Sequence, residues 1–387
     1  MTISPSQERL RVVQVVAHHH RRIAFEWIAQ HHDRERLDLS FILMGEQPPL
    51  WAPALDALDV PHRFVPLSDE RDADAVATLA GCFRELRPEV VHAHYRATFP
   101  ALLAAFLERV PGRVHTRRSG ARPPGRPQPV HLAAIQAMNH RLSTRIVAIS
   151  EVVRSVLEGE GVERDAIDLV HHGFDLEAFS RPDPGEVARL RRRFVPEAAG
   201  PVVGVVSRAV DWKGYQHLVP AFARLLRSHP NAVLLLADLQ GHYLAEVHEL
   251  LATLPQGRVV ITPYVDSMNA LYSLFDVFVH VPTGPGFEAF GMVYIEALAA
   301  GVPSVVTLSG IAHELLEHRR NAWVVPHGDV EALAKGLETV LADSELAWTM
   351  ARQGRLDVDR RFGIETMVSG LEAVYRRAAG RLSSDSE

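Results

Sequence analysis

Residues 284–307 read GPGFEAFGMVYIEALAAGVPSVVT, and they predict a loop, a helix and a strand in succession. Strong helix formers fill residues 292–300, after a small turn at Phe290 and Gly291. Gly301 suits the position just after a helix, and a proline two residues later prevents the helix from continuing. The apolar run that ends the segment predicts a buried strand. Alternation of helix and strand is typical of a doubly wound α/β layer.

Two glutamates of this segment are candidate ligand-binding residues. Glu288 falls on the loop that enters the helix, and Glu296 falls inside the helix, so both can face one cleft. The first backbone amides of the helix, at residues 291–293, have no partner within the helix and suit a phosphate. The alternative for the glutamates is a purely local interaction with the helix dipole.

A second group of charged residues lies in SRAVDWKG, residues 207–214. A strand is predicted to end at Ser207, which places Arg208 and Lys213 on a loop at the carboxyl edge of a sheet. Open α/β sheets bind their ligands at that edge. Two cations there can neutralise a diphosphate leaving group, and solvated surface charges are the alternative.

The same alternation extends in both directions and predicts two α/β units. In the first unit, strands are predicted at residues 10–17, 39–44, 89–93 and 146–149, with helices at 23–31 and 73–86. In the second, strands are predicted at residues 201–207, 232–237, 259–262, 277–281, 304–307 and 322–325, with helices at 218–228, 330–341 and 365–379. Residues 179–200 contain three prolines and interrupt the alternation of strands and helices, and we expect the linker between the two units near the start of this stretch. We expect each unit to bury its own core, with a ligand-binding cleft between the two.

Composition narrows the classes of protein. The chain has 387 residues, enough for two domains, of which 47% are hydrophobic and 23% charged. The 41 Lys and Arg against 47 Asp and Glu give a net charge of -6, which argues against a nucleic-acid binder. Cys82 is the single cysteine, so no internal disulfide can form and a reducing compartment fits.

The polar start of the chain and the absence of an apolar run of membrane-spanning length predict a cytoplasmic protein. Residues 189–194 (RLRRRF) and the arginines of the first unit would allow peripheral contact with anionic lipid at the inner face of a membrane, if the acceptor is lipid-linked. A solvated helix face is the alternative for this segment.

Together these motifs resemble family 4 of the glycosyltransferases, which have the GT-B fold of two Rossmann-like domains with parallel sheets facing across a cleft. FEAFGMVYIEALAAGVP resembles the family signature of two glutamates separated by seven residues, and SRAVDWKG resembles its arginine and lysine-glycine loop. AISEVVRSVLEGEGV followed by HHGFDLEAF resembles the family's crossover between domains. DVFVHVP precedes the signature, and SGIAHELLEH and VVPHGDVEALA follow it. The resemblance covers residues 89–375.

The resemblance implies a retaining enzyme that moves a sugar from a UDP- or GDP-sugar to a glycan, lipid-linked or small-molecule acceptor, with no metal or other cofactor. Glu288 would contact the donor sugar and Glu296 the ribose, while Arg208 and Lys213 would hold the phosphates. The remaining donor-binding residues, several through their backbone amides, would be Ala289, Phe290, Gly291, Met292 and Val293. The implied domains are residues 1–178 for the acceptor and 179–361 for the donor, with a helix at about 362–380 packing back on the first.

Candidate residues of the first domain follow predicted strands. His18 and His19 come directly after the first strand, where the family usually has a glycine-rich loop. A metal site is the alternative for this histidine run, although no carboxylate or cysteine is placed beside it. His94 and Arg96 follow another strand and can face the cleft, and the alternative for His94 is a polar strand end. His92 is expected to be buried packing.

Two positions depart from the family. In VHTRRSG the family commonly has a histidine two residues after the threonine, and Arg118 stands there. Arg117 and Arg118 are candidates to bind an anionic acceptor or the diphosphate, with a solvated loop as the alternative. At Ala237 the family often has a glycine. The departures leave two rival functions, a catalytically idle subunit that binds nucleotide sugars and a GT-B sugar-nucleotide epimerase or phosphorylase.

Overall fold

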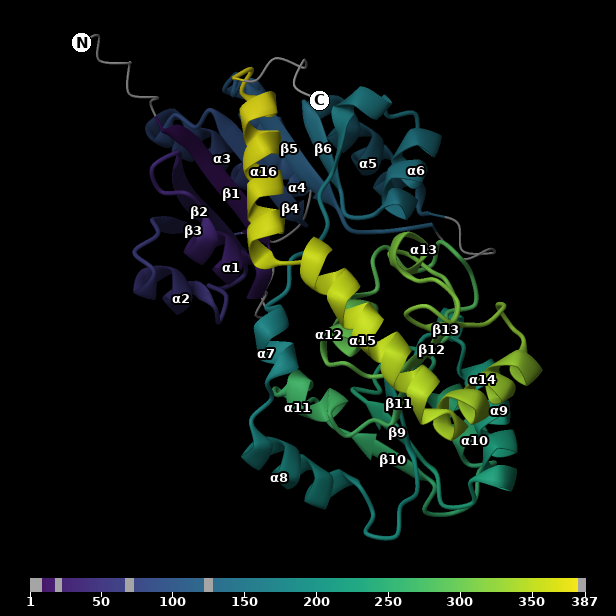
Figure 1. Cartoon of the computed structure of the whole chain (residues 1–387). Coiled ribbons are helices and arrows are strands. Elements are labelled where there is room, and N and C mark those ends of the chain that lie inside the picture. Colours follow the sequence, from purple (N-terminus) through teal and green to yellow (C-terminus); the bar gives the residue numbers. More distant parts are fainter. Residues whose placement is uncertain (1–8, 18–22, 67–72, 122–127, 382–387) are drawn as a thin grey trace. The chain divides into compact units, whose positions relative to one another are not determined.

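A computed structural model describes residues 9–17, 23–66, 73–121 and 128–381, which form two units (Figure 1). The C-terminal unit consists of Asp175–Gly363 and of residues 119–121, and the N-terminal unit takes the remainder. The sequence placed the boundaries after residues 178 and 361, whereas the structure has them after Phe174 and Gly363. Residues 119–121 join the C-terminal unit because the backbone amide of Ala121 donates to the carbonyl of Gly286 at 3.0 Å.

The N-terminal unit is built on a seven-stranded parallel sheet in the order β3-β2-β1-β4-β5-β6-β7. Its strands are β1 (Leu10–Ala17), β2 (Leu37–Gly45), β3 (His62–Pro66), β4 (Val90–Tyr95), β5 (Gly112–Arg117), β6 (Arg145–Ala148) and β7 (Ile167–Leu169). All of β1 is buried except Arg11. A strand covered on both faces is a near-continuous apolar run, which is the pattern that the sequence shows there.

Helices cover both faces of this sheet. α1 (Ile23–His31) and α16 (Ile364–Ala378) pack in one apolar cluster, and α3 (Ala73–Leu86) and α4 (Thr98–Leu107) pack in another. Alternate residues of β1 belong to the two clusters, as expected for opposite faces of a strand. The other helices are α2 (Ala52–Ala57), α5 (Val130–Leu142), α6 (Glu151–Gly159) and the short 3-10 helix η1 (Arg164–Ala166). Figure 1 shows α16, from the far end of the chain, lying along this sheet.

The C-terminal unit has a six-stranded parallel sheet in the order β10-β9-β8-β11-β12-β13. Its strands are β8 (Val202–Val206), β9 (Val233–Ala237), β10 (Val259–Thr262), β11 (Val277–His280), β12 (Ser304–Val306) and β13 (Trp323–Val324). Its helices are α7 (Leu176–Ser180), α8 (Pro184–Phe194), the 3-10 helix η2 (Asp211–Lys213), α9 (Tyr215–Ser228), α10 (Leu244–Leu251), α11 (Met268–Tyr272), α12 (Met292–Ala299), α13 (Ala312–Leu315), α14 (Val330–Ala342) and α15 (Ser344–Arg361).

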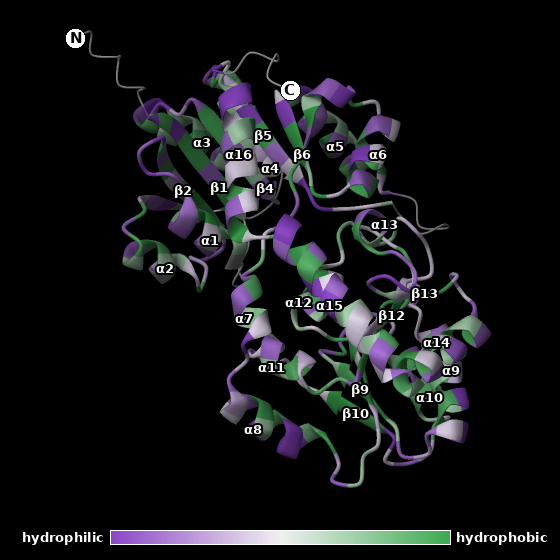
Figure 2. Cartoon of the chain, viewed as in Figure 1, coloured by the Kyte–Doolittle hydropathy of each residue, from purple (hydrophilic) through white to green (hydrophobic). Residues whose placement is uncertain are grey.

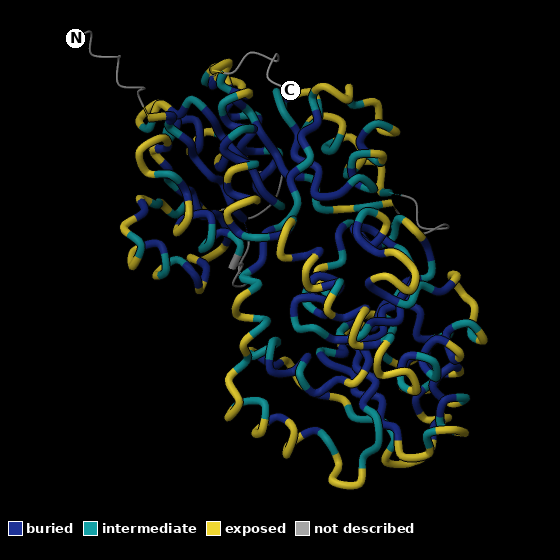
Figure 3. Tube along the Cα trace, viewed as in Figure 1, coloured by how far each residue is buried: buried dark blue, intermediate teal, exposed yellow. Residues whose placement is uncertain are grey.

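The predicted α/β class with two parallel-sheet units is confirmed. Figure 2 shows β9 in the green of hydrophobic residues, and Figure 3 shows that exposed residues lie mainly on helices and loops. Every strand predicted from the sequence is present, but β3, β5 and β7 were missed. No helix within the described residues combines the length and the apolar character that crossing a membrane requires.

One glycine fixes the start of α9 against the neighbouring strand. Gly214 has a φ of 83°, a left-handed conformation that glycine adopts without strain. A Cβ at this position would collide with the carbonyl oxygen of Val281, the residue that follows β11. The close approach holds the preceding residue, Lys213, beside the carboxyl end of β11.

Candidate active site

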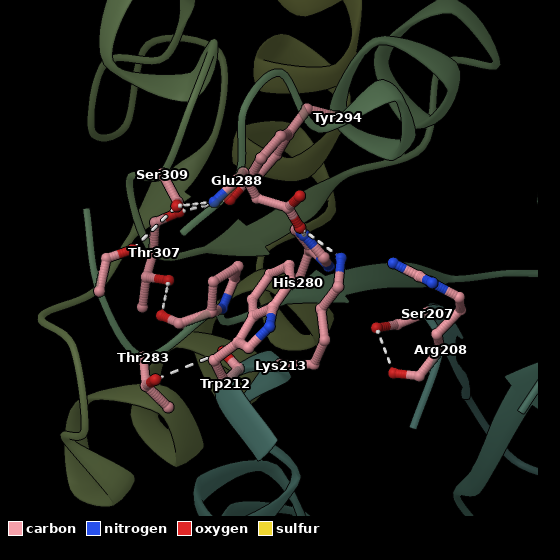
Figure 4. A network of polar contacts seen from close by, with 12 residues as sticks. Ser207, Arg208, Trp212, Lys213, His280, Thr283, Glu288, Tyr294, Thr307 and Ser309 are labelled. Carbon is pink, nitrogen blue, oxygen red and sulfur yellow. Dashed lines mark hydrogen bonds and ion pairs between the residues drawn. The ribbon is translucent and has the colours of Figure 1, made fainter. Parts of the chain in front are cut away.

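A carboxylate, an ammonium group and an imidazole meet at the carboxyl ends of β8 and β11 (Figure 4). Oε1 of Glu288 accepts a hydrogen bond from Nζ of Lys213 and another, at 2.8 Å, from Nε2 of His280. The Glu288 and Lys213 side chains are each 10% exposed and that of His280 is 1% exposed. The three side chains come from the loop before α12, the turn η2 and the end of β11, so tertiary structure alone brings them together.

The cluster keeps Glu288 ionised inside the protein. Burial opposes ionisation of the carboxyl group, but the Lys213 ammonium and the His280 hydrogen bond outweigh it and lower the pKa of Glu288 to about 2. Burial, together with the Lys213 charge, lowers the pKa of His280. His280 is therefore neutral at pH 7 and its Nε2–H donates to Glu288. At neutral pH the cluster consists of one anion, one cation and one neutral donor.

Backbone and hydroxyl contacts fix the loop that carries Glu288. The backbone amide of Glu288 donates to Oγ of Ser309 at 3.1 Å, and this hydroxyl donates in turn to the carbonyl of Gly284 at 2.8 Å. Gly291 caps α12 with a φ of 88°, and a Cβ there would lie 2.7 Å from the ring of Tyr294. The loop is therefore held at its start, at Glu288 and at its entry into the helix.

The remaining donor-side candidates lie in the same unit. Arg208 is exposed on the loop after β8, and Figure 4 shows the ends of the Arg208 and Lys213 side chains pointing toward one another. Phe290 is buried and Met292, the first residue of α12, is 42% exposed. Ala289 and Val293 flank these positions at the start of the helix. The structure thus brings Glu288 and Lys213 into contact, with Arg208 on the adjoining loop pointing toward Lys213.

Glu296 occupies a different environment from Glu288. It lies inside α12, and its Oε2 accepts a hydrogen bond from the hydroxyl of Tyr272 at 2.9 Å. Burial raises the pKa of Glu296 to about 7, against the smaller opposing effect of the Tyr272 hydrogen bond. The two glutamates of the signature are thus held in opposite protonation regimes, because Glu288 has a cation beside it and Glu296 has a neutral hydroxyl.

The candidate site residues of the N-terminal unit lie in different environments. His94 is buried at the end of β4, and its Nδ1 lies 3.0 Å from Nη1 of Arg118. Arg117 points elsewhere and forms a salt bridge with Glu160 at 3.0 Å, with 13% of its side chain exposed. Arg96 is exposed after β4. His18 and His19 lie outside the described residues. Arg117 and Arg118 are therefore not equivalent, and the interpretation of both as a solvated loop is wrong.

Two functional candidates were missed from the sequence, His280 and Tyr272. The signal for His280 was a histidine inside the apolar strand VFVH, where a buried polar group requires a partner. Tyr272 carries no comparable signal, because a tyrosine in an apolar helix is compatible with simple core packing. Within the described part of the chain, no group of three or more His, Cys, Asp or Glu side chains could hold a metal ion.

Comparison with known families accounts for both units. A model described as Glycosyl transferases group 1 matches residues 188–357, and a model described as Glycosyltransferase Family 4 matches residues 11–178. The chain belongs to glycosyltransferase family 4. The matched segments include β1 to β7 in the N-terminal unit and both glutamates of the signature in the C-terminal unit.

Relatives within the family are named for different activities. The chain is 30% identical over 239 residues to a GDP-mannose-dependent alpha-(1-6)-phosphatidylinositol monomannoside mannosyltransferase of Mycobacterium tuberculosis, covering 60% of this chain and 61% of the relative. It is 28% identical over 256 residues to a 2-deoxystreptamine glucosyltransferase of Streptomyces kanamyceticus, covering 65% of each. The chain thus spans about six tenths of the length of these curated relatives.

Solved structures share the fold along the whole chain. HepE of Anabaena, solved in complex with UDP and glucose, has a TM-score of 0.79 at 21% identity, covering 94% of this chain and 99% of that one. A glycosyltransferase of Rickettsia africae has a TM-score of 0.79 at 20% identity, covering 98% of this chain and 100% of that one. The family 4 chain therefore has the GT-B fold expected from the sequence.

All four arginines of the basic segment of α8, at positions 189 and 191–193, are exposed. Leu190 and Phe194 of the same helix are buried against the C-terminal unit. Arg189 forms a salt bridge with Glu186 at 2.6 Å on the same helix. Both sequence-based interpretations, a solvated face and a lipid contact, require this exposure.

The buried pair of Lys213 and Glu288 predicts a specific pattern of stabilities. Lys213→Met leaves an uncompensated buried carboxylate and should lower the free energy of unfolding by about 3–5 kcal/mol. Adding Glu288→Gln to that variant should restore most of the loss. Arg208→Met, an exposed cation of the same loop region, should change stability by less than about 0.5 kcal/mol. Urea unfolding of the four proteins measures these values, and equal losses for Lys213→Met and Arg208→Met would contradict the ion pair.

The raised pKa of Glu296 predicts a pH-dependent stability. The folded protein keeps a proton on Glu296 up to about pH 7, whereas the unfolded chain releases it near its ordinary pKa of 4.5. The unfolded state thus binds fewer protons in this window, and stability falls as pH rises from about 4.5 to 7, by roughly 3 kcal/mol. Glu296→Gln removes this dependence. Urea unfolding of both proteins at pH 5 and pH 8 tests it, and parallel pH profiles would rule out a protonated Glu296.

Proposed function

We propose that this protein is a retaining, metal-independent glycosyltransferase that moves a sugar from a nucleoside diphosphate sugar to a hydroxyl-bearing acceptor. The observation that carries the proposal is the fixed Glu288 beside Lys213 and His280 at the carboxyl edge of the C-terminal sheet. Membership of family 4 supports the same reaction class.

The charges of the C-terminal unit suit a diphosphate leaving group. The bond between the anomeric carbon and the diphosphate oxygen breaks with its electron pair remaining on the diphosphate, and the acceptor oxygen forms the new bond on the same face of the sugar. The acceptor proton passes to a phosphate oxygen of the leaving group. Lys213 and Arg208 then offset the charge that develops on the diphosphate, and the first amides of α12 add donors for it.

The two glutamates are assigned to different parts of the donor, Glu288 to the transferred sugar and Glu296 to the ribose. Glu288 is ionised and lies on the loop that enters α12, so it can stabilise the positive charge that develops on the transferred sugar. Glu296 lies within the helix and can accept hydrogen bonds from the ribose hydroxyls. Its partner Tyr272 leaves further acceptor positions on the carboxylate, because each carboxylate oxygen has two lone pairs.

The donor of this reaction is a UDP-sugar or a GDP-sugar. One relative is named for its dependence on GDP-mannose, and HepE was solved with UDP. Calorimetric titration with UDP, GDP and ADP distinguishes the bases. The best-binding nucleotide then selects the panel of sugar donors for the activity assay.

The reaction itself gives the first test of the proposal. Incubation with the matching nucleotide sugar should release the nucleoside diphosphate, and it should do so at an unchanged rate in excess EDTA. Proton NMR of the product should show the anomeric configuration of the donor. Activity that EDTA abolishes and Mg²⁺ restores, or a product of inverted configuration, would refute the proposed mechanism. Nucleotide binding without any turnover on the donor panel would favour an idle subunit.

The division of roles predicts different defects for the two glutamates. At pH 8, where the Glu296 carboxyl is ionised, Glu296→Gln should weaken nucleoside diphosphate binding about tenfold, since hydrogen bonds to a charged group contribute about 1.5–3 kcal/mol. Glu288→Gln should lower kcat by about 10²–10³ without loss of nucleotide affinity, because its contact strengthens in the transition state and its removal frees Lys213 for the phosphates. Calorimetry and steady-state kinetics measure both effects. The reverse pattern would show that the roles are exchanged.

A further inference from the structure

A row of polar side chains crosses the otherwise apolar face of the N-terminal sheet beneath α16. Gln14 on β1 and His92 on β4 are fully buried, and His94 is 1% exposed. On the same face, Val12 and Val16 of β1 belong to the apolar cluster that packs against α16. Apolar side chains would satisfy these core positions without any hydrogen bond, so the polar row requires an explanation.

The row is one continuous chain of hydrogen bonds that starts at Arg118. Nη1 of Arg118 lies 3.0 Å from Nδ1 of His94, and Nε2 of His94 lies 2.6 Å from Oε1 of Gln14. Nε2 of Gln14 lies 2.6 Å from the hydroxyl of Tyr375 on α16. The chain then continues from Tyr375 to Nδ1 of His92 at 2.9 Å. It ends at Thr116 of β5, whose Oγ1 lies 2.8 Å from Nε2 of His92.

The guanidinium fixes the donors of the first three bonds, as far as Tyr375. Arg118 can only donate, so Nδ1 of His94 accepts and its Nε2 carries the hydrogen. His94 therefore donates to the carbonyl oxygen of Gln14, and the amide of Gln14 donates to Tyr375. With the hydroxyl hydrogen of Tyr375 directed to Nδ1 of His92, Nε2 of His92 can donate to Oγ1 of Thr116. The same tautomer, with the hydrogen on Nε2, serves both histidines.

Burial enforces the neutral histidines that this direction needs. Desolvation lowers the pKa of both His92 and His94 well below the ordinary value, with the nearby Arg118 charge acting in the same sense. This chain of hydrogen bonds thus orients the guanidinium through uncharged groups only. None of its members carries a negative charge that would neutralise Arg118.

The backbone at this edge is strained as well. Tyr95 follows His94 at the end of β4 with a φ of 57°, which is rare for a bulky residue and costs about 1–3 kcal/mol. In this conformation its ring lies under the guanidinium, with Cζ of Arg118 4.7 Å from the ring centroid. Phe25 of α1 flanks the same group at 5.9 Å. Strain of this kind persists where the surrounding structure enforces it, commonly at ligand sites.

We propose that Arg118 binds an oxyanion of a substrate, a phosphoryl or carboxylate group, in the N-terminal unit, and that Gln14 and Tyr375 are positioning residues that orient it through His94. The site lies at the carboxyl ends of β4 and β5, the edge where parallel sheets bind ligands. A fixed guanidinium matches the planar, bidentate geometry of such groups. The proposal rests on the proposed transferase function for the source of the oxyanion, which is either the acceptor or the donor diphosphate.

Calorimetry separates these two sources. Arg118→Gln is compared with Arg63→Gln, which removes a positive charge from an exposed salt bridge of the same unit. Inorganic phosphate is titrated into the protein with and without a saturating nucleoside diphosphate, and the nucleotide is titrated alone. If the oxyanion belongs to the acceptor, Arg118→Gln should weaken phosphate binding at least tenfold in the nucleotide-saturated protein and change nucleotide affinity less than twofold.

If the oxyanion belongs to the donor, Arg118→Gln should instead weaken nucleoside diphosphate binding at least tenfold. If Arg118→Gln weakens neither phosphate binding nor nucleoside diphosphate binding, the oxyanion site is overturned. A wild-type protein that binds phosphate through Arg118 but no nucleotide would refute the proposed transferase and leave this site standing.

The positioning role has a spectroscopic test. In ¹⁵N spectra of the histidine-labelled wild type, His94 should be a neutral Nε2–H tautomer that persists below pH 6.5, the ordinary pKa of an imidazole. Gln14→Leu removes the acceptor of that hydrogen, and Tyr375→Phe removes the next group while keeping the ring. Both variants should change the His94 signals and weaken binding of the oxyanion three- to tenfold, while cooperative unfolding is retained. Unchanged affinity despite an altered His94 tautomer would overturn the positioning role.

Discussion

An ionised carboxylate inside the C-terminal unit is the constraint on which the geometry of its candidate site depends. An isolated buried charge is so unfavourable that the group would take up a proton, and Glu288 remains an anion because Lys213 and His280 surround it. Each partner comes from a different segment. The carboxylate can therefore be satisfied only when the turn after β8, the end of β11 and the loop before α12 are all in their final positions. The charge cluster specifies the loop conformation.

The fold could be predicted from the sequence because buried parallel strands consist of nearly continuous runs of apolar residues. The ends of β1, β10 and α1 agree to the residue with the segments expected from periodicity. The missed strands lack that signal. β7 has three residues, β3 is a partly exposed edge, and β5 reads GRVHTR, whose buried His115 and Thr116 each find a hydrogen-bond partner. Local pattern cannot show partners that lie on other elements.

The same distinction explains what was predictable in the site. The loop positions of Arg208, Lys213 and Glu288 followed from strand ends and from a family signature. The contact between Lys213 and Glu288 joins residues 75 positions apart, and the sequence treated them as ligands for different parts of the donor. Gln14 in LRVVQVVA and His92 in EVVHA were the visible irregularities of the N-terminal network. A polar residue inside an apolar strand marks a required partner without naming it.

The two units hold their cations in physically different ways. Lys213 is paired with a carboxylate, so an incoming anion has to compete with Glu288 for the ammonium, and the attraction that the protein offers is a difference between two ion pairs. Arg118 contacts a neutral histidine and two aromatic rings, and none of these three groups carries a negative charge. Orientation by neutral groups requires a long chain of buried hydrogen bonds, because each member must pass its unsatisfied donor to the next. That requirement accounts for why the polar row continues across three strands and α16 until it reaches Thr116, a hydroxyl that can accept the last hydrogen.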